Sequence, residues 1–169
     1  MESYMNRISN TGIVPVVKIL EKEDAYPLAK ALLNGGIDVI EVTYRSEHAT
    51  SAIQTISEQL PDMLVGAGTV LSVEQAKEAV EAGAKFIITP GFNTKVVQWC
   101  LDHDVEVYPG VSTASEVEMA LSMGLTQLKF FPAESSGGAK KLKDLSAPYA
   151  NVPVSYTHLR AHETDSYLV

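Results

Sequence analysis

The 169-residue chain has little of what disulfide-stabilised, membrane-spanning or nucleic-acid-binding proteins require. Cys100 is its one cysteine, which rules out a disulfide within the chain and favours a cytoplasmic location. No apolar run approaches the ~20 residues of a membrane helix, and the first residues lack the basic and apolar regions of a signal peptide. Thirteen basic against 21 acidic residues give a net charge of −8, which disfavours nucleic acid and anionic membranes as partners.

What is present is a regular alternation of short apolar runs and longer amphipathic ones, in a chain that is 46% hydrophobic. The runs suit one globular domain with a substantial core. Strands are expected over residues 13–19, 38–44, 63–69, 86–89, 105–108 and 127–131, and helices over 22–34, 47–60, 72–82, 94–103, 114–123 and 138–145. Capping boxes are expected at Ser72/Gln75 and Thr113/Glu116, and a helix end at Gly35-Gly36.

Six such units indicate either a doubly wound sheet or a TIM barrel. The expected strands are almost continuously apolar, as parallel strands covered on both faces must be. Polar or special residues stand at or near their carboxyl ends: Glu41, Thr69, Pro90, Pro109 and Lys129. In a barrel these ends meet at the mouth that holds the active site. A doubly wound nucleotide binder would show a glycine-rich segment after its first strand, and there is none here.

Lys129 stands out because it lies in an apolar run, Leu-Lys-Phe-Phe-Pro. Burying an unpaired ammonium costs several kcal/mol, so a lysine there has a partner or a task. A desolvated lysine is partly a neutral amine near neutral pH, and such an amine can form a Schiff base with a carbonyl substrate. The alternative is a lysine of an edge strand whose ammonium reaches solvent.

Two more charged residues belong to the second expected strand. Glu41 shares a face with Val39 and Thr43, while the opposite face is apolar and suits helix packing, which places Glu41 inside. Its carboxylate is either a general acid/base or one half of a buried structural ion pair. Arg45 has the rigid fork that binds carboxylates and phosphates, although a solvated surface arginine fits the pattern too.

Two glycine-containing segments also have two interpretations each. In Gly66-Ala67-Gly68-Thr69, small residues would let a ligand approach the backbone and the Thr69 hydroxyl could bind a carboxylate oxygen. A tight turn into the next helix explains those glycines equally well. The segment Ser135-Ser136-Gly137-Gly138 would either cradle an anion with its N–H groups or form an ordinary loop.

Read together, these residues resemble those of one bacterial enzyme family. The matching segments are 35–37 (GGI), 40–45 (IEVTYR), 65–70 (VGAGTV), 89–91 (TPG), 108–113 (YPGVST) and 128–134 (LKFFPAE). Their order and spacing are similar to those of the 2-keto-3-deoxy-6-phosphogluconate (KDPG) and 4-hydroxy-2-oxoglutarate (KHG) aldolases. The resemblance covers about residues 13–152.

This resemblance implies a class I aldolase on a (β/α)8 TIM barrel, in a cytoplasmic homotrimer that uses no cofactor. KDPG would be cleaved to pyruvate and glyceraldehyde 3-phosphate, the closing step of the Entner–Doudoroff route, and KHG to pyruvate and glyoxylate. Lys129 would form the Schiff base with C2 of this keto-acid substrate, and Glu41 would be the acid/base. Arg45 favours the gluconate-type enzyme over the related phosphogalactonate aldolases.

The resemblance also assigns binding residues. Arg45 and Thr69 would hold the pyruvate carboxylate. Pro90 and Phe131 would line the pocket. The two loops that bind the substrate phosphate in the family follow strands seven and eight, beyond the part of this chain that resembles it.

The C-terminal part departs from the family. A TIM barrel takes ~250 residues, and at residue 169 this sequence is still within the expected seventh strand. Residues 154–164 lack periodicity and read as the in-frame translation of a sequencing-library adapter. We therefore expect an incomplete barrel of about six units plus the start of strand seven over residues 1–153, a non-native tail over 154–169, and little activity from this chain.

Excluding the tail also removes His158 and His162, whose spacing is that of a helical metal pair. His48 and His103 are expected on helix surfaces, so no metal site is predicted. Two alternatives to the aldolase remain open. One is another phosphate-binding barrel, such as a thiamine-phosphate-synthase-like enzyme, against which the Glu41/Lys129 pair argues. The other is a catalytically dead fragment of an aldolase.

Overall fold

A computed structural model describes residues 4–149 and the backbone of residues 154–156. The fold is α/β, and the paired strands run parallel. The chain divides into two compact units, one of Met1–Thr89 with Asn93–Val107 and one of Pro90–Phe92 with Tyr108–Val169. Within the described residues, no helix has the length and apolar character needed to cross a membrane.

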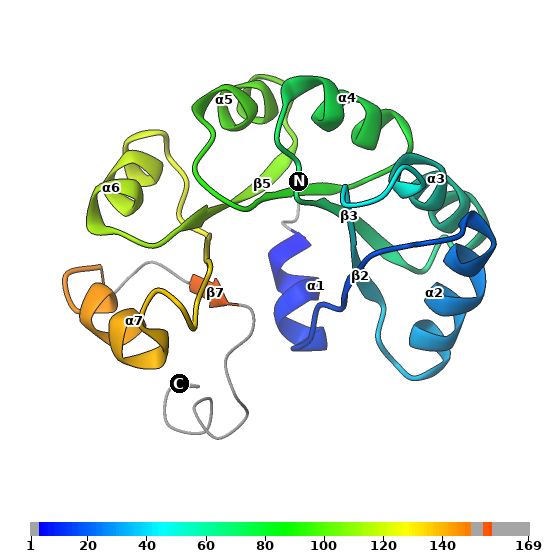
Figure 1. Cartoon of the computed structure of the whole chain (residues 1–169), viewed down its shortest axis with the longest axis horizontal. Helices are drawn as coiled ribbons and strands as arrows, with labels where there is room; N and C mark the ends of the chain where they lie inside the picture. The colour runs from blue at the N-terminus through cyan, green and yellow to red at the C-terminus, as the bar shows by residue number, and fades with distance from the viewer. Residues whose placement is uncertain (1–3, 150–153, 157–169) are drawn as a thin grey trace. The chain divides into compact units, whose positions relative to one another are not determined.

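The first unit is a run of parallel strands with helices between them. Its strands are β1 (Val16–Val17), β2 (Val39–Thr43), β3 (Leu64–Gly68), β4 (Phe86–Thr89) and the start of β5 (Glu106–Val111). Its helices are α1 (Tyr4–Thr11), η1 (Lys22–Asp24), α2 (Ala25–Asn34), α3 (Ala49–Gln59), α4 (Val73–Glu81) and α5 (Thr94–Asp102). Helices α2, α3 and α4 follow one another on the same side of β2 and β3 (Figure 1). Strands β2, β3 and β4 are buried along their whole length, as their apolar sequences predict.

Local signals in the sequence set several of the helix ends. Helix α2 ends where Gly36 takes φ +84° and Ile37 N–H donates to the Leu32 carbonyl, as expected of a glycine C-cap. The expected box of Thr113 and Glu116 forms in both directions. The box expected at Ser72 forms only in part, because Gln75 accepts from the N–H of Leu71 instead of Ser72.

The first strand is much shorter than predicted. Only Val16 and Val17 pair with β2, although the apolar run suggested residues 13–19. Pro15 lies just before the paired residues and has no N–H to donate. Its carbonyl accepts a hydrogen bond from the N–H of Glu41 in β2. Ile13 is 61% exposed, so apolar character alone overstated the length of this strand.

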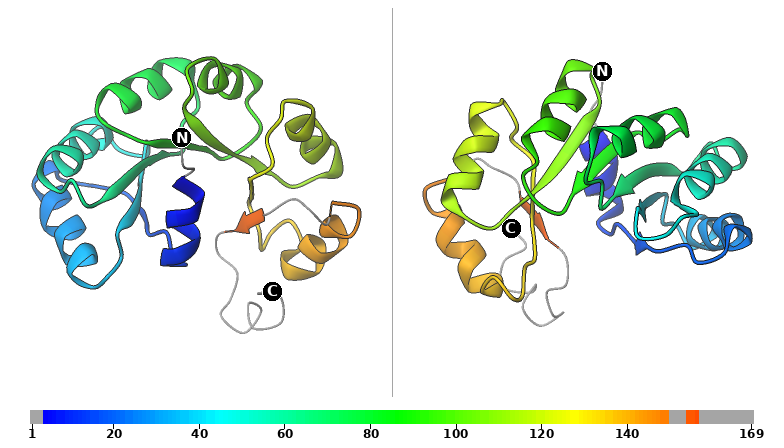
Figure 2. Two further views of the ribbon diagram at one scale, coloured as in Figure 1. Left: turned by 180° about the vertical axis from the view of Figure 1, so that it is seen from behind. Right: turned by 45° about the horizontal axis from the view of Figure 1, so that its top comes forward.

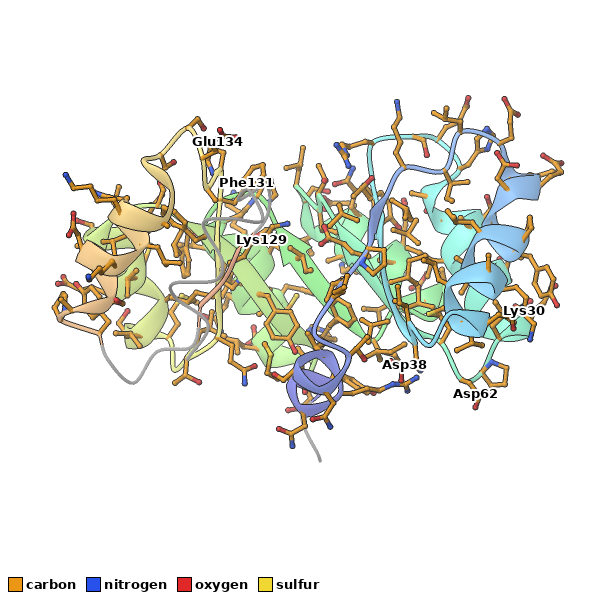
Figure 3. All side chains as sticks on the ribbon, turned by 90° about the horizontal axis from the view of Figure 1, so that it is seen from below. Lys30, Asp38, Asp62, Lys129, Phe131 and Glu134 are labelled. Atoms are coloured by element: carbon orange, nitrogen blue, oxygen red, sulfur yellow. The ribbon has the colours of Figure 1, made fainter. Side chains whose placement is uncertain are left out.

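Helix α1 was not predicted, because it is short and none of its residues is buried. Tertiary hydrogen bonds hold it instead, at the end of the unit where the strands begin. Arg7 pairs with the Asp38 carboxylate at 2.7 Å and also donates to the Asp62 carbonyl. The Thr11 hydroxyl donates to Asp38, which precedes β2. Asp38 and Asp62 both lie at this end of the unit in Figure 3.

The ion pair of Arg7 with Asp38 predicts a pH-dependent stability. The hydrogen bond from Thr11 and the Arg7 guanidinium hold the pKa of Asp38 below its ordinary 3.8. A lowered pKa stabilises the fold above the ordinary value and loses that effect as the pH falls through the folded-state value. We expect Asp38→Asn to cost about 0.5–1 kcal/mol at pH 7 and progressively less as the pH falls below the ordinary value.

Urea unfolding at several pH values measures this cost. The matched control is Glu23→Gln, which removes an exposed pair with Lys22 whose N–O distance is 3.9 Å. It is expected to change stability at no pH. An Asp38→Asn cost that persists unchanged at pH 3 would contradict the electrostatic explanation.

The second unit contains the rest of β5, β6 (Leu128–Phe130), β7 (Val154–Tyr156), α6 (Ala114–Ser122) and α7 (Gly138–Ser146). Strands β5 and β7 pair with the two edges of β6. Residues of β5, α6 and β6 form a buried apolar cluster of Val111, Val117, Ala120 and Leu128. Figure 2 shows the helices of this unit from two further sides.

The predicted boundary at residue 153 falls beside residues that are not described. The backbone of Val154–Tyr156 forms β7, although periodicity did not predict a strand there. The rest of the predicted tail, residues 157–169, lies outside the described residues, and so do His158 and His162. The division into a barrel domain and a non-native tail therefore stays a prediction.

Candidate active site

Lys129 lies in the middle of β6 and is 7% exposed, which confirms its predicted burial. This rules out the alternative in which the ammonium reaches solvent from an edge strand, and β6 has a neighbour on each side. Its Nζ lies 5.3 Å from the centre of the Phe131 ring, close enough for a cation–π interaction. Lys129, Phe131 and Glu134 follow one another from β6 into the next loop in Figure 3.

Pro90 belongs to the same unit as Lys129 and Phe131. Gly110 of β5 is the register partner of Lys129. A Cβ on Gly110 would overlap the carbonyl oxygen of Pro90 and lie 2.5 Å from its carbon. The absent side chain therefore lets the loop that carries Pro90 pack on β5 at the level of the lysine.

Glu41 lies in the middle of β2 and is 2% exposed, so its predicted position inside the protein is confirmed. Its carboxylate lies over Gly68 on the neighbouring strand, where a Cβ would overlap Oε1 and lie 2.6 Å from Cδ and Cγ. Neither of the two explanations for the glycines of residues 66–69, room for a ligand or a tight turn, accounts for Gly68. Gly68 is an ordinary strand residue, and its missing side chain makes room for Glu41, as Gly66 makes room for the ring of Phe86.

Arg45 follows β2 in the same unit and is exposed, yet one side of its guanidinium is anchored. Its Nε–H donates to Thr43 Oγ1 at 3.1 Å, and the Thr43 hydroxyl donates to the Val17 carbonyl at 2.8 Å. The terminal nitrogens of the fork have no hydrogen bond to any described residue. Thr43 was not predicted as a site residue, although its alternation with Glu41 placed it on the same face.

Thr69 follows β3 with φ +56°, in the left-handed region. A β-branched residue rarely adopts this backbone, and the strain costs of order 1–3 kcal/mol. Hydrogen bonds on both sides hold it there: Tyr44 N–H donates to the Gly68 carbonyl, and Val70 N–H donates to the Ile88 carbonyl. The sequence indicated a hydroxyl at this strand end but not the strained backbone that carries it.

The remaining candidates are ordinary structure in the described part of the chain. The N–H groups of Ser136, Gly137 and Gly138 donate to carbonyls of the same loop, so they are not arranged as an anion cradle. His103 stacks on Trp99 at the end of α5, with ring centroids 4.4 Å apart. Residues 4–149 contain no cluster of three His, Cys, Asp or Glu side chains that could hold a metal ion.

The model of the KDPG and KHG aldolase family matches residues 4–168 of the chain. A 2-dehydro-3-deoxy-phosphogluconate aldolase of Treponema pallidum is 45% identical over 162 residues, which are 94% of this chain and 77% of that protein. The chain belongs to the KDPG and KHG aldolase family. Another member, the KHG/KDPG aldolase of Escherichia coli K12, is 43% identical over 86% of this chain and 68% of its own.

Solved structures of the family share the α/β fold. A KDPG aldolase of Legionella pneumophila, with pyruvate captured at low pH as a covalent carbinolamine intermediate, aligns with a TM-score of 0.87 and 38% identity. The alignment covers 92% of this chain and 76% of the Legionella chain. The KDPG aldolase of Zymomonas mobilis ATCC 29191 aligns with a TM-score of 0.86 and 36% identity, over 92% of this chain and 75% of that one.

Proposed function

We propose that this chain is a class I aldolase that cleaves KDPG to pyruvate and glyceraldehyde 3-phosphate, and KHG to pyruvate and glyoxylate. The observation that carries the proposal is a lysine that is 7% exposed in the middle of a parallel strand, in a member of this family. Lys129 is the amine and Glu41 the acid/base of one reaction. A homotrimeric, cytoplasmic parent with a complete barrel remains part of the proposal, and so does the low activity expected of this chain relative to that parent.

The proposed cleavage needs two groups of the protein, the amine of Lys129 and the carboxylate of Glu41. Lys129 Nζ attacks the C2 carbonyl to give a carbinolamine, which loses water to form an iminium ion. The iminium accepts the electron pair of the C3–C4 bond as Glu41 takes the proton of the C4 hydroxyl, and the aldehyde leaves. Glu41 then returns a proton to C3 of the enamine, and water releases pyruvate. The iminium is the electron sink, so the scheme uses no metal or cofactor.

Arg45 and Thr69 bind the carboxylate of the keto acid in this proposal. Thr43 anchors Nε of Arg45, so the outer edge of the fork is oriented before substrate arrives. The strained backbone of Thr69 supports a role for its hydroxyl, because such strain persists mainly where function requires it.

Phe131 and Pro90 shape the surroundings of the amine. The Phe131 ring lies 5.3 Å from Nζ, close enough to stabilise the iminium cation that forms there in the proposed reaction. Pro90 packs its carbonyl on Gly110, the register partner of Lys129.

Exchange of the methyl protons of pyruvate in D₂O tests the proposed function. Formation and reprotonation of the enamine exchange these protons, and neither the aldehyde nor the phosphate takes part. We expect the chain to exchange pyruvate but not lactate, which lacks the carbonyl. We expect Arg45→Gln to raise the half-saturating pyruvate concentration about 10–100-fold, because a hydrogen bond to a charged group is worth about 1.5–3 kcal/mol.

The matched control is Arg7→Gln, which changes the arginine at the opposite end of β2. Saturation by pyruvate should not change in that variant. NMR follows the exchange directly. A chain that exchanges no pyruvate would instead be the inactive fragment that the sequence leaves open, and equal saturation in Arg45→Gln would remove Arg45 from the carboxylate site.

A further inference from the structure

We infer that Gly68 is a positioning residue for Glu41, a role that rests on the acid/base function proposed for that carboxylate. Gly68 ends β3, and its own register partner on β2 is Thr43. The partner of Glu41 is Gly66, two residues earlier. The side chain of Glu41 nevertheless lies over Gly68, so it leans along the sheet toward the carboxyl ends of the strands.

Phe86 explains the direction of this lean. It is the register partner of Gly66 on the other side of β3, and its ring fills the space where a Gly66 side chain would be. Phe86 is fully buried. The place directly opposite Glu41 is therefore taken by an aromatic ring, while the place above Gly68 is left empty by the second glycine. The filled place and the empty place together direct the Glu41 carboxylate toward the carboxyl end of β3, which Thr69 follows.

The backbone does not require glycine at residue 68. Gly68 lies in β3 and has no positive φ, unlike Gly36 or Gly83. An alanine there would keep the strand and its pairing with Thr43. Its Cβ would overlap Oε1 of Glu41 and lie 2.6 Å from both Cγ and Cδ, so a different terminal rotamer does not relieve the clash. The whole side chain of Glu41 must move.

Two measurements separate a displaced carboxylate from a damaged fold. Trapping of pyruvate by borohydride reports the amine chemistry of Lys129, and methyl-proton exchange of pyruvate reports the proton transfer by Glu41. We expect Gly68→Ala to keep most of the trapping rate and to lose about 10²-fold in exchange, the typical cost of misplacing a catalytic group by an ångström.

Gly83→Ala is the control, in the turn after α4 and outside the strands that carry Glu41. Its Cβ would meet the side chain of Ser57 rather than a catalytic group or a residue that packs on one. We expect it to lower the unfolding temperature while leaving exchange per folded molecule nearly unchanged. Cys100 supplies the measure of folded protein, because its thiol is buried in α5 and labels only on opening.

The Glu41→Ala background decides whether Gly68 acts through Glu41. This variant removes the atoms that the new Cβ would meet, so adding Gly68→Ala should cost no further exchange and less stability than in the parent chain. Equal losses in both backgrounds, or normal exchange in Gly68→Ala alone, would overturn the inference. Normal exchange in Glu41→Gln would instead overturn the acid/base assignment, and the positioning role with it.

Discussion

Lys129→Met is expected to reduce pyruvate release from KDPG by at least about 10³-fold, because no second amine replaces a covalent nucleophile. Methionine is close to lysine in length and shape, so the strand and its packing should be retained. Coupling pyruvate to lactate dehydrogenase gives the rate.

The control for this variant is Lys140→Met in α7 of the same unit. Lys140 is exposed, and its replacement should leave both the rate and the unfolding temperature unchanged. If Lys129→Met kept a rate within tenfold of the parent chain, the amine would be somewhere else. Loss of activity in both variants would point to a general effect of charge rather than to a Schiff base.

Glu41→Gln is expected to slow turnover by about 10²-fold or more, the usual size of general acid–base catalysis. The glutamine keeps the shape of the side chain over Gly68 and removes its ability to accept and return a proton. Pyruvate methyl exchange should therefore fall as far as turnover does. Borohydride trapping of pyruvate should fall less, because several proton transfers of the cycle come after the iminium forms.

The matched control is Glu47→Gln, which neutralises an exposed carboxylate soon after the same strand. It should change neither measurement. Near-normal turnover in Glu41→Gln would leave Glu41 as half of a structural ion pair, the other interpretation open from the sequence. In that case the stability of the variant, rather than its rate, should be the quantity that falls.

The strands and helices were predictable because their signals are local. The apolar run of β4 (Phe86–Thr89) fell on the predicted residues, and the boxes and glycines at helix ends were visible in the sequence. Helix α1 was not, because hydrogen bonds from Arg7 to residues far along the chain hold it in place. The length of β1 was overestimated because a proline in an apolar run limits pairing more than apolar character promotes it.

The candidate site was predictable as residue types but not as geometry. A lysine in an apolar run and a glutamate on an alternating strand are unusual enough to be recognised singly. The role of Gly68 was not visible, because it depends on which atoms of the neighbouring strand lie above it. The positive φ of Thr69 was equally hidden, since nothing in a β-branched residue suggests the left-handed region.

Peptide mapping of the chain after reaction with pyruvate and borohydride tests the Schiff-base assignment most directly. Reduction fixes the iminium as a stable secondary amine, so the modified lysine carries the mass of one reduced pyruvyl group. The account predicts that this mass appears on the peptide containing Lys129 and on no other. An adduct on a different lysine, or none at saturating pyruvate, would contradict it.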